Sequence, residues 1–426
     1  MRSVLDRRPR TAPAPTGPRP PARFATHLAG WLALGAAVAT GATVLIWWGT
    51  GAPRAAVLGD RLDLVRIALT VTGGVGGVVA LTIAYRKQRL AETAERREDT
   101  KVYAERYGRC AEQLGSERPA VRMAGVHALA GLADDWPAGR QTCVDVLCSY
   151  LRMPYASAQP DDPAERQVRQ TVLRVIADRL RPGAAVPWQG YDVDFSDALL
   201  DGANLRGIRL VGGSLRFDGA VLATGTLDLS GATVSDCRIS FTGAELTGGT
   251  VLADWAEFER AALDLDRSRC TAGAVELTRC SFRDSRLGLR GATIRGGGIR
   301  LNRTVFVGGG LSLRGAELAG GDVVLHKADL DGTEISMDDM TLTGGTVGFA
   351  RSRIVSSALS LHHATLAGGT LDVSGVYLAG TAVDLRGADL TGTAIRVDRS
   401  FPREVFDLAE AARCVGSPFV DENAPG

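Results

Sequence analysis

Residues 291–330, GATIRGGGIRLNRTVFVGGGLSLRGAELAGGDVVLHKADL, repeat an apolar position every twelve residues. Ile294, Phe306, Leu318 and Leu330 occupy that position. An α-helix with 3.6 residues per turn cannot hold such a column on one face, whereas stacked short strands can. The stretch therefore predicts a repeat protein built from strands.

The repeat extends from about residue 218 to residue 397 and contains four apolar columns. The first column comprises Leu222, Val234, Leu246, Phe258, Cys270, Phe282, Ile294, Phe306, Leu318, Leu330, Leu342, Ile354, Leu366, Leu378 and Leu390. The second comprises Ile239, Val251, Leu263, Val275, Leu287, Ile299, Leu311, Val323, Ile335, Val347, Leu359, Leu371, Val383 and Ile395, and the third Leu265, Leu277, Leu289, Leu301, Leu313 and Leu325. The fourth is small: Ala244, Ala256, Cys280, Ala292, Ala316, Ala328, Ala364 and Ala388.

The spacing between columns predicts how the strands are joined. Inward residues come in pairs two apart, which is the alternation of a β-strand. Two-residue joints such as Arg314-Gly315 alternate with four-residue, Gly-rich joints such as 319–322. If both joints are corners, one coil takes 24 residues. The alternative is a flattened coil of 12 residues, whose two-residue joint would have to cross the ~10 Å between facing sheets.

A shorter period precedes this region. In YDVDFSDALLDGANLRGIRL the residues Phe195, Leu200, Leu205 and Leu210 recur every five positions, each two places after Val193, Ala198, Ala203 and Ile208. Residues 191–215 resemble the pentapeptide-repeat proteins in this pattern, most closely in ALLDGANLRG. The resemblance implies a right-handed, four-sided β-helix with the leucines and alanines pointing inward. The predicted solenoid spans 188–400.

Two uncharged runs near the start of the chain predict a transmembrane hairpin over 28–85. Residues 28–48 and 67–85 lack charged side chains and are long enough to cross ~30 Å of hydrocarbon as helices. A cleaved signal peptide is the alternative for the first run, and a buried core helix for the second. Gly73 and Gly77 form a GxxxG that lets two helices pack closely, within the hairpin or between protomers of a homo-oligomer.

Charge distribution predicts the orientation of the hairpin. Arginines are concentrated in the Pro-rich tail at 1–27, predicted to be disordered, and again directly after residue 85. The loop between the runs mixes arginines with Asp60 and Asp63. Because basic residues favour the cytoplasmic side, both termini are expected in the cytoplasm, with the protein in a bacterial inner membrane.

Residues 86–182 predict a helical stalk and a small all-α region. Amphipathic patterns follow one another after residue 86, at 116–135, in CVDVLCSYLR (143–152), and after a polar linker at 155–163. The set resembles a pair of HEAT-like helical hairpins. Residues 401–426 are expected to provide a C-terminal cap, with a short helix over 402–415 and a disordered tail. The predicted fold class is therefore α+β.

No catalytic constellation is present in the sequence. The seven cysteines lack CxxC or CxxH spacing, and Cys270 and Cys280 fall in inward columns. His127 and Trp136 are expected to be structural, and His326, His362 and His363 fall at outward corners, as do Asp338 and Asp339. We therefore predict no catalytic, cofactor-binding or metal-binding residues, no cofactor, and no enzymatic activity.

Basic residues recur near one corner of the predicted solenoid. They are Arg267, Arg279, Arg290, Arg303, Arg314, Lys327 and Arg351, with Arg290 and Arg314 out of strict register. Nucleic-acid binding is not expected from them, because aromatic residues do not interleave with the charges.

The layout of the whole chain resembles the membrane-associated pentapeptide-repeat proteins of bacteria, whose helical region has a similar EQLGS…VR…ALAGLA pattern. We predict a membrane-anchored cytoplasmic scaffold that binds the lipid bilayer and a protein partner. The alternative is a DNA-mimicking regulator of an enzyme such as DNA gyrase. That mimicry requires an acidic face, whereas residues 191–400 contain 26 acidic and 21 basic residues.

Overall fold

A computed structural model describes residues 58–154, 162–398, 411–414 and 419–421, together with Ala37, Thr40, Gly41, Val44 and Trp48. The chain divides into two compact units, Met1–Lys101 and Val102–Gly426. Helix α2, Leu58–Leu114, contributes residues to both units.

Helix α2 is longer than the sequence predicts. It begins at Leu58, so residues 58–66, predicted as a loop between two membrane spans, are helical. Residues 67–85 and the predicted stalk after them belong to one continuous helix that ends before Gly115. The first predicted span, at 28–48, lies outside the described residues apart from five positions. Of the helices in the described part of the chain, none is both long and apolar enough to span a membrane.

Three further helices and one short turn form a bundle, which confirms the helical region. They are α3 (Pro119–Asp135), η1 (Pro137–Gly139), α4 (Arg140–Arg152) and α5 (Pro163–Leu180). Proline occupies the first turn of α3 and α5, and Asp162 caps α5 by accepting bonds from the backbone N–H of Ala164 and Glu165. Their apolar faces, including Val126, Leu147 and Val172, are fully buried.

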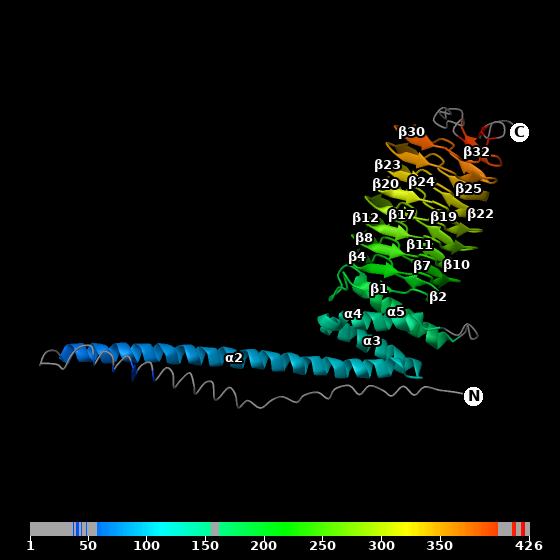
Figure 1. The fold of residues 1–426 in the computed structure, drawn as a ribbon. Coiled ribbons are helices and arrows are strands. Elements are labelled where there is room, and N and C mark those ends of the chain that lie inside the picture. The colour runs from blue at the N-terminus through cyan, green and yellow to red at the C-terminus, as the bar shows by residue number, and fades with distance from the viewer. Residues whose placement is uncertain are drawn as a thin grey trace, which may run out of the picture. The chain divides into compact units, whose positions relative to one another are not determined.

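The region from Asp192 to Val397 is a parallel β-solenoid with 24 residues per coil (Figure 1). Register fixes this number: Phe258 pairs with Phe282, and Phe282 with Phe306. The flattened 12-residue alternative is therefore wrong. Inside, these three rings stack with centroids 4.5 and 4.6 Å apart. Nearly all residues of the four apolar columns are buried, as predicted; Leu378 and Val383 are partly buried.

Most complete coils have four strands, which belong to three sheets. The first sheet comprises β1 (Asp192–Asp194), β5 (Ser214–Arg216), β9 (Arg238–Ser240), β13 (Ala262–Asp264), β17 (Arg286–Gly288), β21 (Gly310–Ser312), β24 (Glu334–Ser336), β27 (Ala358–Ser360) and β31 (Ala382–Asp384). The second comprises β4 (Arg209–Val211), β8 (Thr233–Ser235), β12 (Glu257–Glu259), β16 (Ser281–Arg283), β20 (Val305–Val307), β23 (Asp329–Asp331), β26 (Arg353–Val355) and β30 (Tyr377–Ala379).

The third sheet contains two rows of strands. One row comprises β2 (Leu199–Leu200), β6 (Val221–Leu222), β10 (Glu245–Leu246), β14 (Arg269–Cys270), β18 (Thr293–Ile294) and β28 (Thr365–Leu366). The other comprises β3 (Ala203–Asn204), β7 (Thr226–Asp228), β11 (Thr250–Leu252), β15 (Ala274–Glu276), β19 (Gly298–Arg300), β29 (Thr370–Asp372), β32 (Ala394–Val397) and β33 (Phe419–Asp421). The long strands β22 (Glu317–Val324) and β25 (Thr341–Gly348) pass through both rows.

The Gly-rich joints differ from the predicted wide corner at two places. Residues 319–322 and 343–346 lie inside β22 and β25, so the backbone there continues as one bent strand with a register shift. Glycine is required because adjacent coils approach closely: a Cβ on Gly297 would lie 1.8 Å from the carbonyl oxygen of Gly273. Glycines spaced 24 residues apart form a column through the third sheet: Gly225, Gly249, Gly273, Gly297, Gly321, Gly345 and Gly369.

The two-residue joints are tight corners, as predicted. Their second residue has a positive φ whether or not it is glycine, for example 65° at Gly315 and 56° at Arg303. The backbone N–H of Arg303 donates to the carbonyl oxygen of His326 in the next coil at 2.8 Å. Such bonds continue the inter-coil ladder through the corner and hold successive corners in line.

Helices α4 and α5 pack against the first coil and cap the N-terminal end of the solenoid (Figure 1). The side chain of Gln141 in α4 donates to the carbonyl oxygen of Asp192 and accepts from its N–H, so it satisfies the free edge of β1. Arg169 in α5 donates to the carbonyl oxygens of Leu151 and Leu199, each at 2.8 Å. Trp188, just before the first coil, is fully buried, and Tyr191 is partly buried.

The C-terminal region differs from its prediction where it is described. Residues 419–421, expected to be disordered, form β33, which pairs in parallel with β32. Most of the predicted cap helix at 402–415 lies outside the described residues, and the described part, 411–414, is not helical. Arg413 instead bridges to Asp389, one coil away.

Candidate interaction surface

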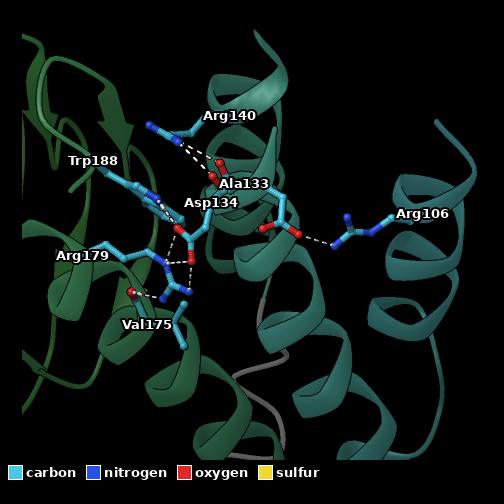
Figure 2. A network of polar contacts seen from close by, with 8 residues as sticks. Arg106, Ala133, Asp134, Arg140, Val175, Arg179 and Trp188 are labelled. Atoms are coloured by element: carbon cyan, nitrogen blue, oxygen red, sulfur yellow. Dashed lines mark hydrogen bonds and ion pairs between the residues drawn. The ribbon is translucent and has the colours of Figure 1, made fainter. Parts of the chain in front are cut away.

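Asp134, at the end of α3, binds α5 and the segment that leads into the first coil (Figure 2). Its carboxylate accepts from the guanidinium of Arg179 in α5, with the shortest contact at 2.6 Å, and from the indole Nε1 of Trp188 at 2.9 Å. The guanidinium of Arg140 donates to the carbonyl oxygens of Ala133 and Asp134. Sequence analysis missed this cluster because its members are far apart in the chain. Its role is to join the helical cap to the solenoid.

A second cluster, partly buried, lies within the helical cap. Arg122 in α3 pairs with Glu165 in α5 at 2.7 Å, and the hydroxyl of Tyr150 in α4 donates to the same carboxylate. Burial and the Glu165 carboxylate raise the pKa of Tyr150 to about 12, so the phenol remains a donor at neutral pH. Because these side chains bind one another within the bundle, the cluster has a structural role.

Ion pairs between adjacent coils cover much of the outer surface of the solenoid. Arginines contact acids one coil away in Asp236–Arg260, Glu245–Arg269, Asp266–Arg290, Glu276–Arg300, Asp329–Arg353, Asp372–Arg396 and Asp389–Arg413. Because parallel pairing repeats every 24 residues, these side chains lie directly above one another. Charge on these strips is locally neutralised.

One corner departs from this neutral pattern. Arg279, Arg303, Lys327 and Arg351 are the second residues of four successive corners between the third and second sheets; we call them the cation row. All four are exposed, and within the described residues none of them forms an ion pair. Successive coils lie ~4.8 Å apart, so the row extends about 14 Å. It is a straight, narrow line of positive charge.

The cation row contains four of the seven basic residues predicted near one corner. The structure places Arg267, Arg290 and Arg314 on the other two-residue corner, where Arg290 pairs with Asp266 and Arg314 with Asp339. At one end of the row, the Arg279 guanidinium lies 4.6 Å from the centroid of the Trp255 ring, an arrangement typical of a cation–π contact. Arg290 and Arg314 are out of strict register because each is the first residue of its corner, before Gly291 and Gly315, whereas the other five basic residues are second residues of their corners.

A shallow groove follows the four-residue joints between the second and first sheets. It encloses about 660 Å³, and its floor is made of small residues such as Gly213, Ala261 and Gly309. Its rim contains three arginines and three acids: Arg238, Arg260, Arg286, Asp236, Asp284 and Glu334. Arg260 holds Asp236 through two hydrogen bonds of 2.8 and 2.9 Å, so the groove carries little net charge.

Asp264, beside this groove, is a buried carboxylate with incomplete bonding. Its side chain is 5% exposed; Arg238 approaches one oxygen to 3.3 Å and Arg286 the other to 3.8 Å. Oδ1 has no hydrogen-bond partner among the described residues. Burial raises the pKa of the carboxyl, and the two arginines offset this only partly. The charged groups next to Asp264 are the arginines Arg238 and Arg286, which hold it in the fold. We therefore infer that Asp264 lowers the stability of the solenoid and has no chemical role.

The histidines and cysteines lie where the sequence places them. His326, His362 and His363 occupy two-residue corners, and Cys270 and Cys280 are buried in the solenoid core. Burial raises the pKa of Cys280 to about 12, which keeps the thiol protonated and unreactive. Asp338 and Asp339 lie at a corner, where Asp338 accepts bonds from Ser336 and from the backbone N–H of His362. Across the described ranges, no three His, Cys, Asp or Glu side chains converge as a metal site.

Comparisons with family models, curated proteins and solved structures found no match to this chain. The class of protein is therefore defined by its own architecture: a parallel β-solenoid preceded by a helical cap.

Proposed function

We propose that the chain is a non-catalytic scaffold that binds a protein partner on the side of its solenoid. The observation that carries this proposal is the cation row, four exposed charges without ion pairs in the described part of the chain, beside strips of ion-paired residues. Such charges, held in line by inter-coil hydrogen bonds, favour recognition, because they need no rearrangement to meet a complementary surface. Because the helical cap covers the N-terminal end of the solenoid, the sides of the solenoid, and not that end, are available to a partner.

The alternative, a DNA-mimicking regulator, gains less support. Such a mimic needs a surface dominated by unpaired acids, whereas Asp266, Glu276 and Asp329 each contact an arginine one coil away. The cation row, which is the longest row of charges without ion pairs among the described residues, is positive, whereas a DNA mimic is negative. Membership of the pentapeptide-repeat family remains part of the proposal, supported by the five-residue period at 191–215 and the tight two-residue corners.

We also propose that the scaffold is anchored in a bacterial inner membrane by residues 28–85. The support is the pair of uncharged runs with flanking arginines, and the exposure of Val78, Leu81 and Tyr85 on α2. Alkaline carbonate extraction of cell membranes tests the anchor. Retention of the full-length chain in the pellet is expected, and its release into the supernatant would contradict the anchor.

Site-specific photo-cross-linking tests where a partner binds. A photoreactive residue replaces Asn302, beside the cation row, or, as matched exposed controls, Arg269 on the third sheet or Glu112 on α2. We expect a discrete protein adduct in cells from position 302 and little or none from the controls. Adducts only from position 112 would contradict binding by the solenoid.

A further inference from the structure

We infer that the cation row binds an extended acidic polypeptide segment, one that presents several Asp or Glu carboxylates along a strand. This inference rests on the proposed function and specifies the chemistry of the partner. It is carried by the geometry of the row, by the backbone conformation of its members, and by the chemistry of the residues around it.

The members of the row share a left-handed backbone conformation. Arg279, Arg303, Lys327 and Arg351 have φ of 60°, 56°, 56° and 58°, a left-handed conformation that favours glycine. In the same column, three other coils have glycine, at Gly207, Gly231 and Gly375, and one has Trp255, whose φ is 61°. A non-glycine residue in this conformation costs ~1 kcal/mol or more. Four consecutive coils therefore keep a cation where glycine would be less strained, which points to a use for the charge.

The charged surface formed by the row is narrow. The strands on either side of the row carry neutral ion pairs, Glu276–Arg300 before the corner and Asp329–Arg353 after it. A broad anionic surface, such as a lipid bilayer, would cover these neutral pairs as well as the row. A narrow chain contacts the row alone. The surface therefore favours a linear polyanion.

The residues beside the row favour a peptide over a nucleic acid as its ligand. Proteins that bind single-stranded nucleic acid stack its bases on aromatic side chains. The first positions of the four corners are Thr278, Asn302, His326 and Ala350, which offer no row of aromatic rings. Trp255 lies at the end of the row, but its ring is already covered by Arg279.

An extended peptide fits the length and the donors of the row. Alternate residues of a strand project to one side every ~6.6 Å, so two or three carboxylates span the ~14 Å of the row. Guanidinium groups bind carboxylates with two parallel hydrogen bonds, and three of the four members are arginines. Asn302 and Thr278 add neutral donors that can reach the peptide carbonyl groups.

The test uses the full-length protein in detergent and a fluorescein-labelled peptide of eight aspartates, with binding measured by fluorescence anisotropy. In the row variant, Arg279, Arg303, Lys327 and Arg351 are all changed to Gln. In the control variant, the ion-paired Arg260, Arg269, Arg290 and Arg386 are changed to Gln, which alters net charge equally. We expect the row variant to bind at least about tenfold more weakly than wild type, and the control to bind within about threefold of it.

His326 supplies an independent readout of binding at the row. Burial and the cations Lys327, Arg351 and Arg303 lower its pKa, whereas Asp372 acts in the opposite direction. A bound polyanion would offset the cations, so the pKa of His326, followed by NMR, should rise when the peptide is added. An unchanged pKa at saturating peptide would place the peptide elsewhere and overturn the inference.

Two further probes separate the classes of partner. Tighter row-dependent binding of an eight-residue oligothymidylate, or of phosphatidylserine vesicles, than of the aspartate peptide would assign the row to nucleic acid or lipid and overturn the inference. Binding of none of the three probes would make the row a solubilising feature and also overturn it. In either case, a photo-cross-linked protein adduct at position 302 would leave the proposed function standing.

Discussion

Trp188 and Asp134 are 54 positions apart in the chain, yet the indole Nε1 of Trp188 donates to the Asp134 carboxylate at 2.9 Å. Arg179 binds the same carboxylate and lies 5.0 Å from the centroid of the Trp188 ring. One acid therefore connects α3, α5 and the start of the solenoid. Its neighbour Asp135 forms a more exposed pair with Arg106.

These adjacent acids provide a matched pair of variants. Asp134→Ala leaves Arg179 and the Trp188 indole without their shared acceptor, and should lower the free energy of unfolding by about 2–4 kcal/mol. Asp135→Ala removes a pair whose side chains are 56% and 42% exposed, and should cost less than about 1 kcal/mol. Denaturant unfolding followed by circular dichroism measures both. Equal losses would contradict the connecting role of Asp134.

Close approach of coils at the glycine column predicts a large effect of a single methyl group. Gly297→Ala would place a Cβ 1.8 Å from a backbone oxygen and should destabilise the solenoid by about 3 kcal/mol or more. Gly231→Ala is the control, since its φ is similarly positive but its Cβ would meet nothing within 4 Å. That variant should cost about 1 kcal/mol. A small effect at Gly297 would mean that the coils can separate there.

Strain in the cation row can be measured directly. Arg303→Gly should leave stability unchanged or raise it by up to about 1 kcal/mol, because glycine adopts the left-handed conformation without strain. Arg303→Val should lower stability by about 1–2 kcal/mol, because a β-branched side chain tolerates that conformation poorly. Thermal unfolding of the two variants and of wild type measures these differences in stability. A clear loss with Gly would show that Arg303 stabilises the fold, which would weaken the functional argument.

Asp264 should make stability depend on pH in an unusual direction. Its folded-state pKa is raised above the unfolded value, so its ionisation opposes folding above that folded pKa, and the penalty disappears as pH falls through the acid range. Asp264→Ser should therefore raise stability at pH 7 by about 1 kcal/mol, with a smaller gain near pH 3. Serine is compatible with the site, since Ser240, one coil earlier, occupies the equivalent position. A loss of stability at pH 7 would show that Arg238 and Arg286 outweigh burial.

The sequence was sufficient to predict the core of the solenoid but not its coil length. Leu246, Phe258 and Leu263 could be assigned inward because strand alternation leaves no other arrangement for their spacing. The choice between 24 and 12 residues depended on the backbone at two-residue corners such as 302–303. There Arg303 adopts a left-handed turn, which the sequence encodes only weakly when glycine is absent.

The sequence predicted which basic residues lie at corners of the solenoid, but not which corner each of them occupies. The sequence pattern contains all seven basic positions, but Arg279 and Arg290 could be assigned to different corners only once the 24-residue register was known. Asp134, Arg179 and Trp188 gave no signal, because their contact depends on how α3, α5 and the first coil pack. Strand β33 was missed because its pairing with β32 is a long-range contact.

The measurement that tests the central claim most directly is quantitative partner capture from detergent-solubilised membranes, comparing full-length wild type with the row variant and its charge-matched control. The account predicts that protein partners captured by wild type and by the control are lost, or reduced at least about tenfold, with the row variant. Capture of the same partners at the same level by all three proteins would contradict the claim that the side of the solenoid is a binding surface organised around the cation row.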